Sequence, residues 1–194
     1  MQAWELNQDS YRLTSVSETT GLVAFFRRER RAYESVGKLT ASGLRPEFFA
    51  NQRVRSGRSE DAKASFDWNT MKVTLGKAQE QKSVALPADA QDLMSFMYQL
   101  GLRPLPPGRI ELPITNGWKL ERYELEVGAE ELLQTPFGAL RALPVKQVRR
   151  AGQESIELWL ATEYRLLPVK IQFFDRQGER SGEQLVSDIR VSDD

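Results

Sequence analysis

The sequence predicts a mainly β protein: a curled, incomplete antiparallel β-barrel with one buried plug helix. Two observations lead to this prediction. Apolar and polar residues alternate with a period of two along most of the chain, which is typical of half-buried strands. Turn-forming residues interrupt the alternation at short intervals, so the connections have hairpin length. Because many strands in one flat sheet leave long exposed edges, we expect the sheet to curl or close.

The strand pattern runs through the whole sequence of 194 residues. We find no internal repeat and no shift in composition that marks a boundary, so we expect one β-barrel-like domain over residues 1–194. Strands are predicted at 3–6, 11–16, 22–27, 33–40, 48–54, 64–68, 72–75, 83–86, 109–114, 119–127, 131–135, 138–148, 155–161, 168–174 and 183–191.

Residues 88–100 break the alternation and predict the helix. Apolar side chains recur there at i, i+3, i+4 and i+7, which places them on one helix face. They are Leu93, Phe96, Met97 and Leu100. Asp89 is suited to the N-cap, and Gly101 to a left-handed C-cap. Met94 extends the apolar surface to a second side, so we expect a largely enclosed helix that packs on the concave side of the sheet.

Composition excludes several classes of function. The 27 Lys and Arg residues balance 27 Asp and Glu residues, so the chain lacks the positive field of a non-specific nucleic-acid binder. The sequence has no His and no Cys, which excludes imidazole bases, thiol nucleophiles, disulfides and the common zinc sites. We therefore expect no cofactor, no metal and no enzymatic activity. No run of about 18 apolar residues occurs, so we expect no transmembrane segment in this chain.

Two charged stretches have ordinary interpretations. Residues 27–31 hold four arginines around Glu29 and are either a contact for anionic lipid or phosphate or, as we favour, a solvated hairpin tip. A second group of acidic residues mostly alternates with apolar ones, as on the outer face of a sheet, and lacks the spacing of a calcium loop. They are Glu121, Glu124, Glu126, Glu130 and Glu131.

Several single residues have both a structural and a functional interpretation. Gly37 and Gly43 mark either bends in strands, which we favour, or points of close ligand approach. Trp68 and Trp159 are either core anchors or walls of a ligand cavity. Carboxylates such as Asp67 or Asp92 with Glu163 would serve glycoside hydrolysis only if two of them converged in a cleft. Because Asp92 also suits a cap, we do not favour that chemistry.

Seven short stretches resemble the bacterial domain of unknown function numbered 3108. They are SVGKL at 35–39, GLRPEFF at 43–49, FDW at 66–68, QDLMS at 91–95, TPFG at 135–138, WLA at 159–161 and LPVKI at 167–171. Their order and spacing cover nearly the whole chain. The resemblance implies a fold similar to the incomplete, helix-plugged barrel of the periplasmic lipoprotein carriers, and the family has no assigned activity.

The same resemblance implies a location. Members of the family look like exported proteins of Gram-negative bacteria, some with an N-terminal membrane anchor. We therefore expect a periplasmic protein. The start of this chain departs from the family pattern, and we expect it to lack the first strand and a targeting or anchoring segment.

A curled sheet around a helix favours a non-enzymatic protein that binds a hydrophobic or lipid-like ligand inside the barrel, in the assembly of the cell envelope. Seven residues are expected to line the cavity: Trp68, Leu93, Met94, Phe96, Met97, Leu100 and Trp159. The alternative is a structural or adaptor protein of the envelope, with a filled core, that contacts partner proteins through its surface or an edge strand. A carboxylate hydrolase is the third and least favoured hypothesis.

Overall fold

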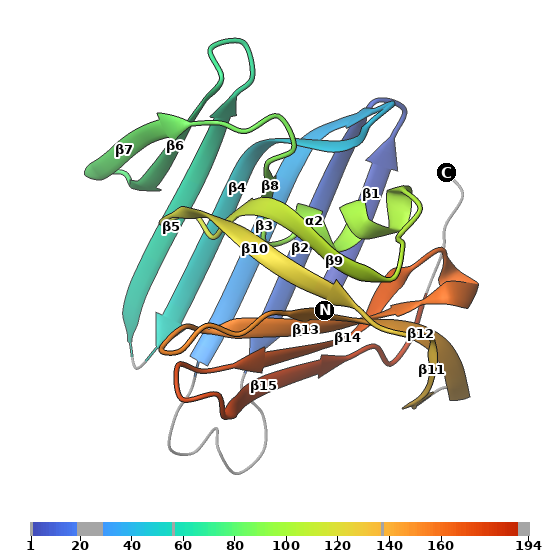
Figure 1. Cartoon of the computed structure of the whole chain (residues 1–194). Helices are drawn as coiled ribbons and strands as arrows, with labels where there is room; N and C mark the ends of the chain where they lie inside the picture. The colour runs from blue at the N-terminus through green and yellow to red at the C-terminus, as the bar shows by residue number, and fades with distance from the viewer. Residues whose placement is uncertain (1, 19–28, 56, 137, 190–194) are drawn as a thin grey trace. The chain divides into compact units, whose positions relative to one another are not determined.

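The computed structural model describes residues 2–18, 29–55, 57–136 and 138–189. Contacts within the chain define two compact units. The first unit is Met1–Gln99 with Leu112–Arg122, and the second is Leu100–Glu111 with Tyr123–Asp194. Both are built mainly from antiparallel strands (Figure 1), so the mainly β prediction is confirmed.

The first unit contains a seven-stranded sheet in which the strands follow one another in sequence order. They are β1 (Gln2–Asn7), β2 (Ser10–Glu18), β3 (Glu29–Thr40), β4 (Gly43–Arg55), β5 (Arg58–Asp67), β6 (Lys72–Lys77) and β7 (Glu80–Ala85). Every neighbouring pair is antiparallel. The strand predicted at 22–27 lies outside the described residues, whereas β3, β4 and β5 all begin several residues before their predicted starts.

One face of this sheet is buried, and we call it the inner face. In register across four strands, Leu13 lies opposite Ser35, Ser35 opposite Phe49, and Phe49 opposite Ala64. All four side chains are 0% exposed. Because side chains alternate between the two faces of a strand, every second residue from Phe49 toward Arg55 and from Ala64 toward Arg58 also belongs to the inner face. The opposite face is polar, as the ion pair between Arg12 and Glu34 illustrates.

The predicted helix is enclosed but much shorter than expected. Residues 88–100 contain a short strand, β8 (Gln91–Asp92), and one helical turn and a half, α2 (Ser95–Gln99), followed by the 3-10 helix η1 (Leu100–Leu102). All five residues of α2 are buried. The helix is shorter because Gln91 and Asp92 pair in parallel with Ile114 and Thr115 of β9 (Gly108–Thr115), which removes them from the helix.

Both predicted helix caps are wrong. Asp92 is the residue that caps α2: its Oδ1 atom accepts hydrogen bonds from the backbone N–H groups of Met94 and Ser95, each at 2.8 Å. Asp89 lies before β8, and the strand β8 separates it from the first turn of α2. Gly101 lies inside η1 without the positive φ of a left-handed cap.

Contacts on the inner face hold α2 against the sheet. The side chain of Gln99 accepts a hydrogen bond from the Leu44 backbone N–H at 2.7 Å and donates to the Ser42 carbonyl at 3.1 Å. Trp4 of β1 packs edge-on against Tyr98, with ring centroids 4.9 Å apart. The helix therefore packs against the inner face through contacts with both β1 and the start of β4.

The structural interpretation of the two strand glycines is confirmed. The register of β3 and β4 shifts between Val36 and Gly37, which marks a β-bulge. A Cβ atom at Gly37 would lie 2.8 Å from the Pro46 Cα and 2.8 Å from a ring carbon of Tyr11, so protein atoms fill this space. Gly43 has a φ of +102° at the turn that starts β4.

A second sheet has the strand order β15-β14-β13-β12-β10-β9-β8, and β11 also pairs with β12. Its remaining strands are β10 (Leu120–Val127), β11 (Glu131–Thr135), β12 (Gly138–Gln147), β13 (Ser155–Ala161), β14 (Leu167–Phe174) and β15 (Arg180–Leu185). In the second unit Leu158 lies in register with Val145 and Ile171, and all three are buried. The last strand ends at Leu185 rather than at the predicted 191, and Val186 and Ile189 pack against a buried cluster on β11–β14 instead.

Candidate functional site

The inner face of β4 changes from apolar to cationic along its length. Phe49 is fully buried, Asn51 and Arg53 are half-buried, and Arg55 is exposed at the end of the strand. These four residues alternate along β4 and therefore share one face. The neighbouring strand β5 shows the same change, because its inner face starts with Arg58 and Glu60 before the buried residue Ala62.

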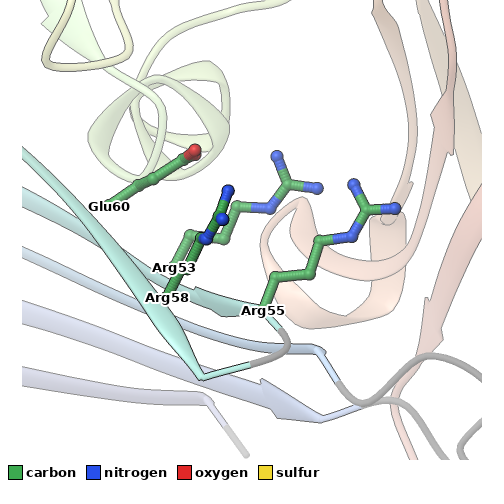
Figure 2. A pocket seen from close by; sticks show the side chains of 4 residues that line it. All are labelled: Arg53, Arg55, Arg58 and Glu60. Atoms are coloured by element: carbon green, nitrogen blue, oxygen red, sulfur yellow. The ribbon is translucent and has the colours of Figure 1, made fainter.

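A pocket of about 440 Å³ lies at this cationic end. Four side chains line it: Arg53, Arg55, Arg58 and Glu60. Figure 2 shows all four projecting from the end of the β4–β5 hairpin toward the same side of the sheet. We call this site the arginine pocket.

One wall of the arginine pocket is held in place by Glu29. The Arg53 guanidinium donates two hydrogen bonds to the Glu29 carboxylate, one to each oxygen, at 3.0 and 2.9 Å. Arg31 donates a further hydrogen bond to the Oε1 atom of Glu29. Burial raises the pKa of Glu29, but the hydrogen bonds from Arg53 and Arg31 outweigh it, and the net pKa lies below its ordinary value. Glu29 therefore stays ionised and orients Arg53.

Arg55 and Arg58 lie opposite one another in the register of β4 and β5. Within the described residues neither guanidinium has a carboxylate partner or a cation–π contact. Arg53 faces Glu60 in the same register, yet its guanidinium binds Glu29 on the other neighbouring strand. The pocket thus presents two cations without a counter-ion in the described part of the chain.

This arrangement is suited to binding an anion. Arginine presents several N–H donors in a rigid plane and forms paired hydrogen bonds with carboxylates and phosphates. Because arginine remains protonated in proteins, these three side chains cannot act as bases. Glu60 is the one ionisable group lining the pocket that could accept a proton.

A separate polar cluster lies buried beneath α2. The Ser35 hydroxyl donates to Oδ2 of Asp92 at 2.7 Å, so the Tyr11 hydroxyl must donate to the Ser35 oxygen, 3.1 Å away. Burial raises the pKa of Asp92 to about 6, against the lowering effect of its hydrogen bonds from Ser35, Ser95 and Met94. Burial also raises the pKa of Tyr11. This cluster joins β2, β3 and the cap of α2, and its role is structural.

Five of the seven residues predicted to line a cavity lie in the first unit. Met94, Phe96 and Met97 are buried on α2 or directly before it, and Leu93 is half-buried. Trp68 is half-buried and donates its indole N–H to the Pro46 carbonyl at 2.6 Å. The guanidinium of Arg45 lies 5.0 Å above its ring. None of these side chains lines the arginine pocket, and their role around a ligand stays a prediction.

The other two predicted residues, Leu100 and Trp159, lie in the second unit and are buried. Trp159 belongs to a core cluster with Leu133, Leu140, Ala142, Ala161 and Val169. Its indole N–H donates to the Glu131 carboxylate at 2.6 Å, and the Lys170 ammonium lies 4.4 Å from the ring centroid. This environment is that of a core anchor.

The carboxylates considered for hydrolysis each have a structural partner. Asp67 accepts hydrogen bonds from the backbone N–H groups of Asn69 and Thr70, both at 3.0 Å, in a turn. Asp92 caps α2, and Glu163 binds the Arg141 backbone and side chain. Among the described residues, no three acidic side chains come together in a way that could hold a metal ion.

The basic stretch at 27–31 lies only partly within the described residues, since Arg27 and Arg28 fall outside them. The rest is the first part of β3 rather than a hairpin tip, which corrects the prediction. Arg30 points to the outer face and pairs with Glu18, with 3.3 Å between nitrogen and oxygen. Arg31 points to the inner face and binds Glu29.

Sequence reasoning missed all four residues of the arginine pocket. A signal was present, because Arg53, Arg55, Arg58 and Glu60 flank the residue pair Ser56-Gly57, which is turn-forming in sequence, with the spacing of one strand face. The predicted strands stopped at 54 and restarted at 64, so this spacing was not connected to a shared face.

No helix in the described part of the chain has both the length and the apolar character that crossing a membrane requires.

Comparison with known proteins places the chain in a family. The model of the family described as "Protein of unknown function (DUF3108)" matches residues 1–183. The chain belongs to the DUF3108 family. No curated protein matches this DUF3108 chain in sequence. Among solved structures, it is similar to the crystal structure of a beta-barrel-like protein of domain of unknown function DUF1849 from Brucella abortus.

That likeness has a TM-score of 0.55 at 10% sequence identity and covers 95% of the DUF3108 chain and 85% of the other chain. At this identity the likeness concerns the fold alone. It confirms the β-barrel-like fold expected from the sequence.

Proposed function

We propose that this DUF3108 protein is a non-enzymatic periplasmic protein that binds an acidic, lipid-like ligand in the assembly of the cell envelope. The observation that carries the proposal is the arginine pocket at the end of a largely apolar inner face. The acidic group of the ligand binds Arg55 and Arg58, which line this pocket of about 440 Å³ together with Arg53 and Glu60. A volume of this size lies within the range of small-molecule sites.

The inner face next to the pocket supports a ligand that is part apolar. Along β4, the fully buried Phe49 lies only four residues from Arg53 on the same face. Met97 lies in α2 and Met94 lies directly before it, and α2 packs against this face. Methionine side chains are unbranched and flexible, so they can repack around an apolar chain more easily than branched side chains.

The chemistry of the described residues supports binding rather than catalysis. The pocket is lined by three arginines and one glutamate, so Glu60 has no second carboxylate beside it in the lining, as glycoside hydrolysis would require. Asp92, whose pKa is raised to about 6, is 0% exposed and is engaged as a helix cap. A periplasmic location is part of this proposal because the sequence resemblance implies that members of the family are exported, and the absence of cysteine is compatible with it.

Native mass spectrometry of the protein, gently extracted from bacterial cells that produce it, tests the proposal. We expect a bound species with the mass of an anionic lipid or fatty acid in the periplasmic or envelope fraction. The variant with Arg55→Gln and Arg58→Gln should lose this species. Arg30→Gln, which removes one cation from the outer face at the same end of the sheet, should keep it.

A clean unliganded mass, before and after incubation with anionic lipids, would overturn the binding proposal and favour the adaptor alternative. Recovery of the protein from the cytoplasmic fraction alone would overturn the location. Turnover of a lipid or glycoside by the purified protein, abolished by Glu60→Gln, would overturn the non-enzymatic assignment.

A further inference from the structure

We infer that Arg55 and Arg58 together bind one doubly charged phosphate group, the terminal phosphate of a phosphomonoester. This inference rests on the proposed function and specifies the acidic group of its ligand. It also predicts that inorganic phosphate, which offers the same oxygens and charge, occupies the site by itself.

The first argument is the register of the two strands. Arg55 and Arg58 are directly opposite one another at the end of the β4–β5 hairpin. Opposing side chains on one face have Cβ atoms about 5 Å apart, and like charges in such positions destabilise a sheet. On its other side Arg55 lies opposite Glu29 of β3, whose carboxylate binds Arg53 and Arg31. Opposite charges that face one another across two strands can form an ion pair, as Lys77 and Glu80 do across β6 and β7 at 3.2 Å. Arg55 and Arg58 cannot neutralise one another in this way.

The second argument is the charge. Arg31 and Arg53 share the carboxylate of Glu29. These three side chains together therefore carry one net positive charge. The negative charge of Glu60 balances it, so the two positive charges of Arg55 and Arg58 remain at the pocket. A phosphomonoester carries between about −1.5 and −2 at neutral pH, which matches this excess.

The third argument is the number of acceptor oxygens. Glu29 shows how a carboxylate behaves at this end of the sheet: Arg53 binds both of its oxygens, so Arg31 has to share Oε1 with Arg53. A phosphomonoester has three terminal oxygens, so it can bind two guanidinium groups that approach from neighbouring strands. A ligand carboxylate could pair fully with only one of the two arginines.

Isothermal titration calorimetry of the whole protein at pH 7.5 and constant ionic strength tests the inference. We expect inorganic phosphate to bind more tightly than acetate. The variant with Arg55→Gln and Arg58→Gln should bind phosphate at least about tenfold more weakly, the effect of losing one or two charge-assisted hydrogen bonds. The side chains of Arg55 and Arg58 are exposed, so their replacement leaves the core intact.

Two matched variants separate a specific site from general attraction to positive charge. Glu60→Gln removes the one negative charge that lines the pocket and should strengthen phosphate binding severalfold. Arg30→Gln removes a positive charge at the same end of the sheet but on the opposite face, and should leave the affinity within twofold. Equal losses in Arg30→Gln and the double variant, or acetate binding as tight as that of phosphate, would overturn the inference.

Vesicles distinguish the source of the phosphate. Phosphatidylcholine vesicles containing phosphatidic acid carry the phosphomonoester, whereas phosphatidylglycerol vesicles carry a phosphodiester and oleic acid carries a carboxylate. Preference for phosphatidic acid supports both proposals. Binding of oleic acid without phosphate overturns the phosphate inference but keeps the proposed function. Binding of inorganic phosphate without any lipid keeps the phosphate site and overturns the lipid-like ligand.

Discussion

Ser35 donates its hydroxyl hydrogen to Oδ2 of Asp92 across 2.7 Å, inside the buried layer between β3 and α2. The same carboxylate holds the N-terminal turn of α2 through its other oxygen. One side chain thus fixes the position of the helix on the sheet and caps it. The carboxylate is fully buried, so the state of its proton affects the stability of the whole first unit.

We predict that the contribution of Asp92 to the free energy of unfolding falls as the pH rises from about 4 to about 6. Burial raises the pKa of Asp92 in the folded protein to about 6 from an ordinary value of 3.8, so between these values the folded state binds more proton than the unfolded state. Asp92→Asn should flatten this slope, because an amide does not ionise there. Urea unfolding of both proteins between pH 4 and 7 measures the difference. A parallel pH dependence in the two proteins would contradict the prediction.

We predict that Gln99→Ala destabilises the protein by about 1–3 kcal/mol, the cost of leaving a buried backbone donor without a partner. Its side chain is the acceptor for the buried Leu44 N–H and the donor to the Ser42 carbonyl. Gln52→Ala, an exposed position on β4, serves as the control and should change stability by less than about 0.5 kcal/mol. Chemical unfolding measures both. Similar values for the two variants would show that Gln99 does not hold the helix.

We predict that alanine is tolerated differently at two glycines of the first sheet. Gly37→Ala places a Cβ against the Pro46 backbone and the Tyr11 ring, and overpacking of this kind costs about 1–3 kcal/mol. At Gly57 no heavy atom lies within 4 Å of the new Cβ, so Gly57→Ala meets only the strain of a φ of +78°.

Gly57→Asn separates these two causes, because asparagine adopts positive φ more readily than alanine does. It should recover part of the stability lost in Gly57→Ala, whereas no side chain should be accepted at Gly37. Thermal unfolding of Gly37→Ala, Gly57→Ala and Gly57→Asn measures the order of their stabilities. A Gly37→Ala protein as stable as the wild type would contradict the close contact with Tyr11.

Much of the fold could be predicted from the sequence because it depends on local patterns. The alternation in residues 33–40 and 48–54 predicted β3 and β4, and the apolar residues around Phe96 predicted a buried helix. The length of that helix could not be predicted. It depends on the pairing of Gln91 and Asp92 with β9, a contact between distant parts of the chain that overrides a helical pattern.

The arginine pocket was harder to predict for a different physical reason. Its residues become neighbours only when β4 and β5 pair in one register, since a shift by one residue would move Arg55 to the opposite face. Arg53 is a further example: it faces Glu60 in register but binds Glu29, 24 residues earlier in the sequence. Spacing can indicate such a cluster, but choosing the counter-ion requires the three-dimensional arrangement.

The order of the strands in the first sheet has a consequence for how the chain acquires its structure. From β1 to β7, each strand pairs with the one made just before it, and the hairpin turns between them are mostly short. The loops that must close to form this sheet are therefore small, which lowers the entropic barrier relative to all-β proteins with distant pairings. The hairpins can form one after another, and α2 can dock last on a surface that already exists.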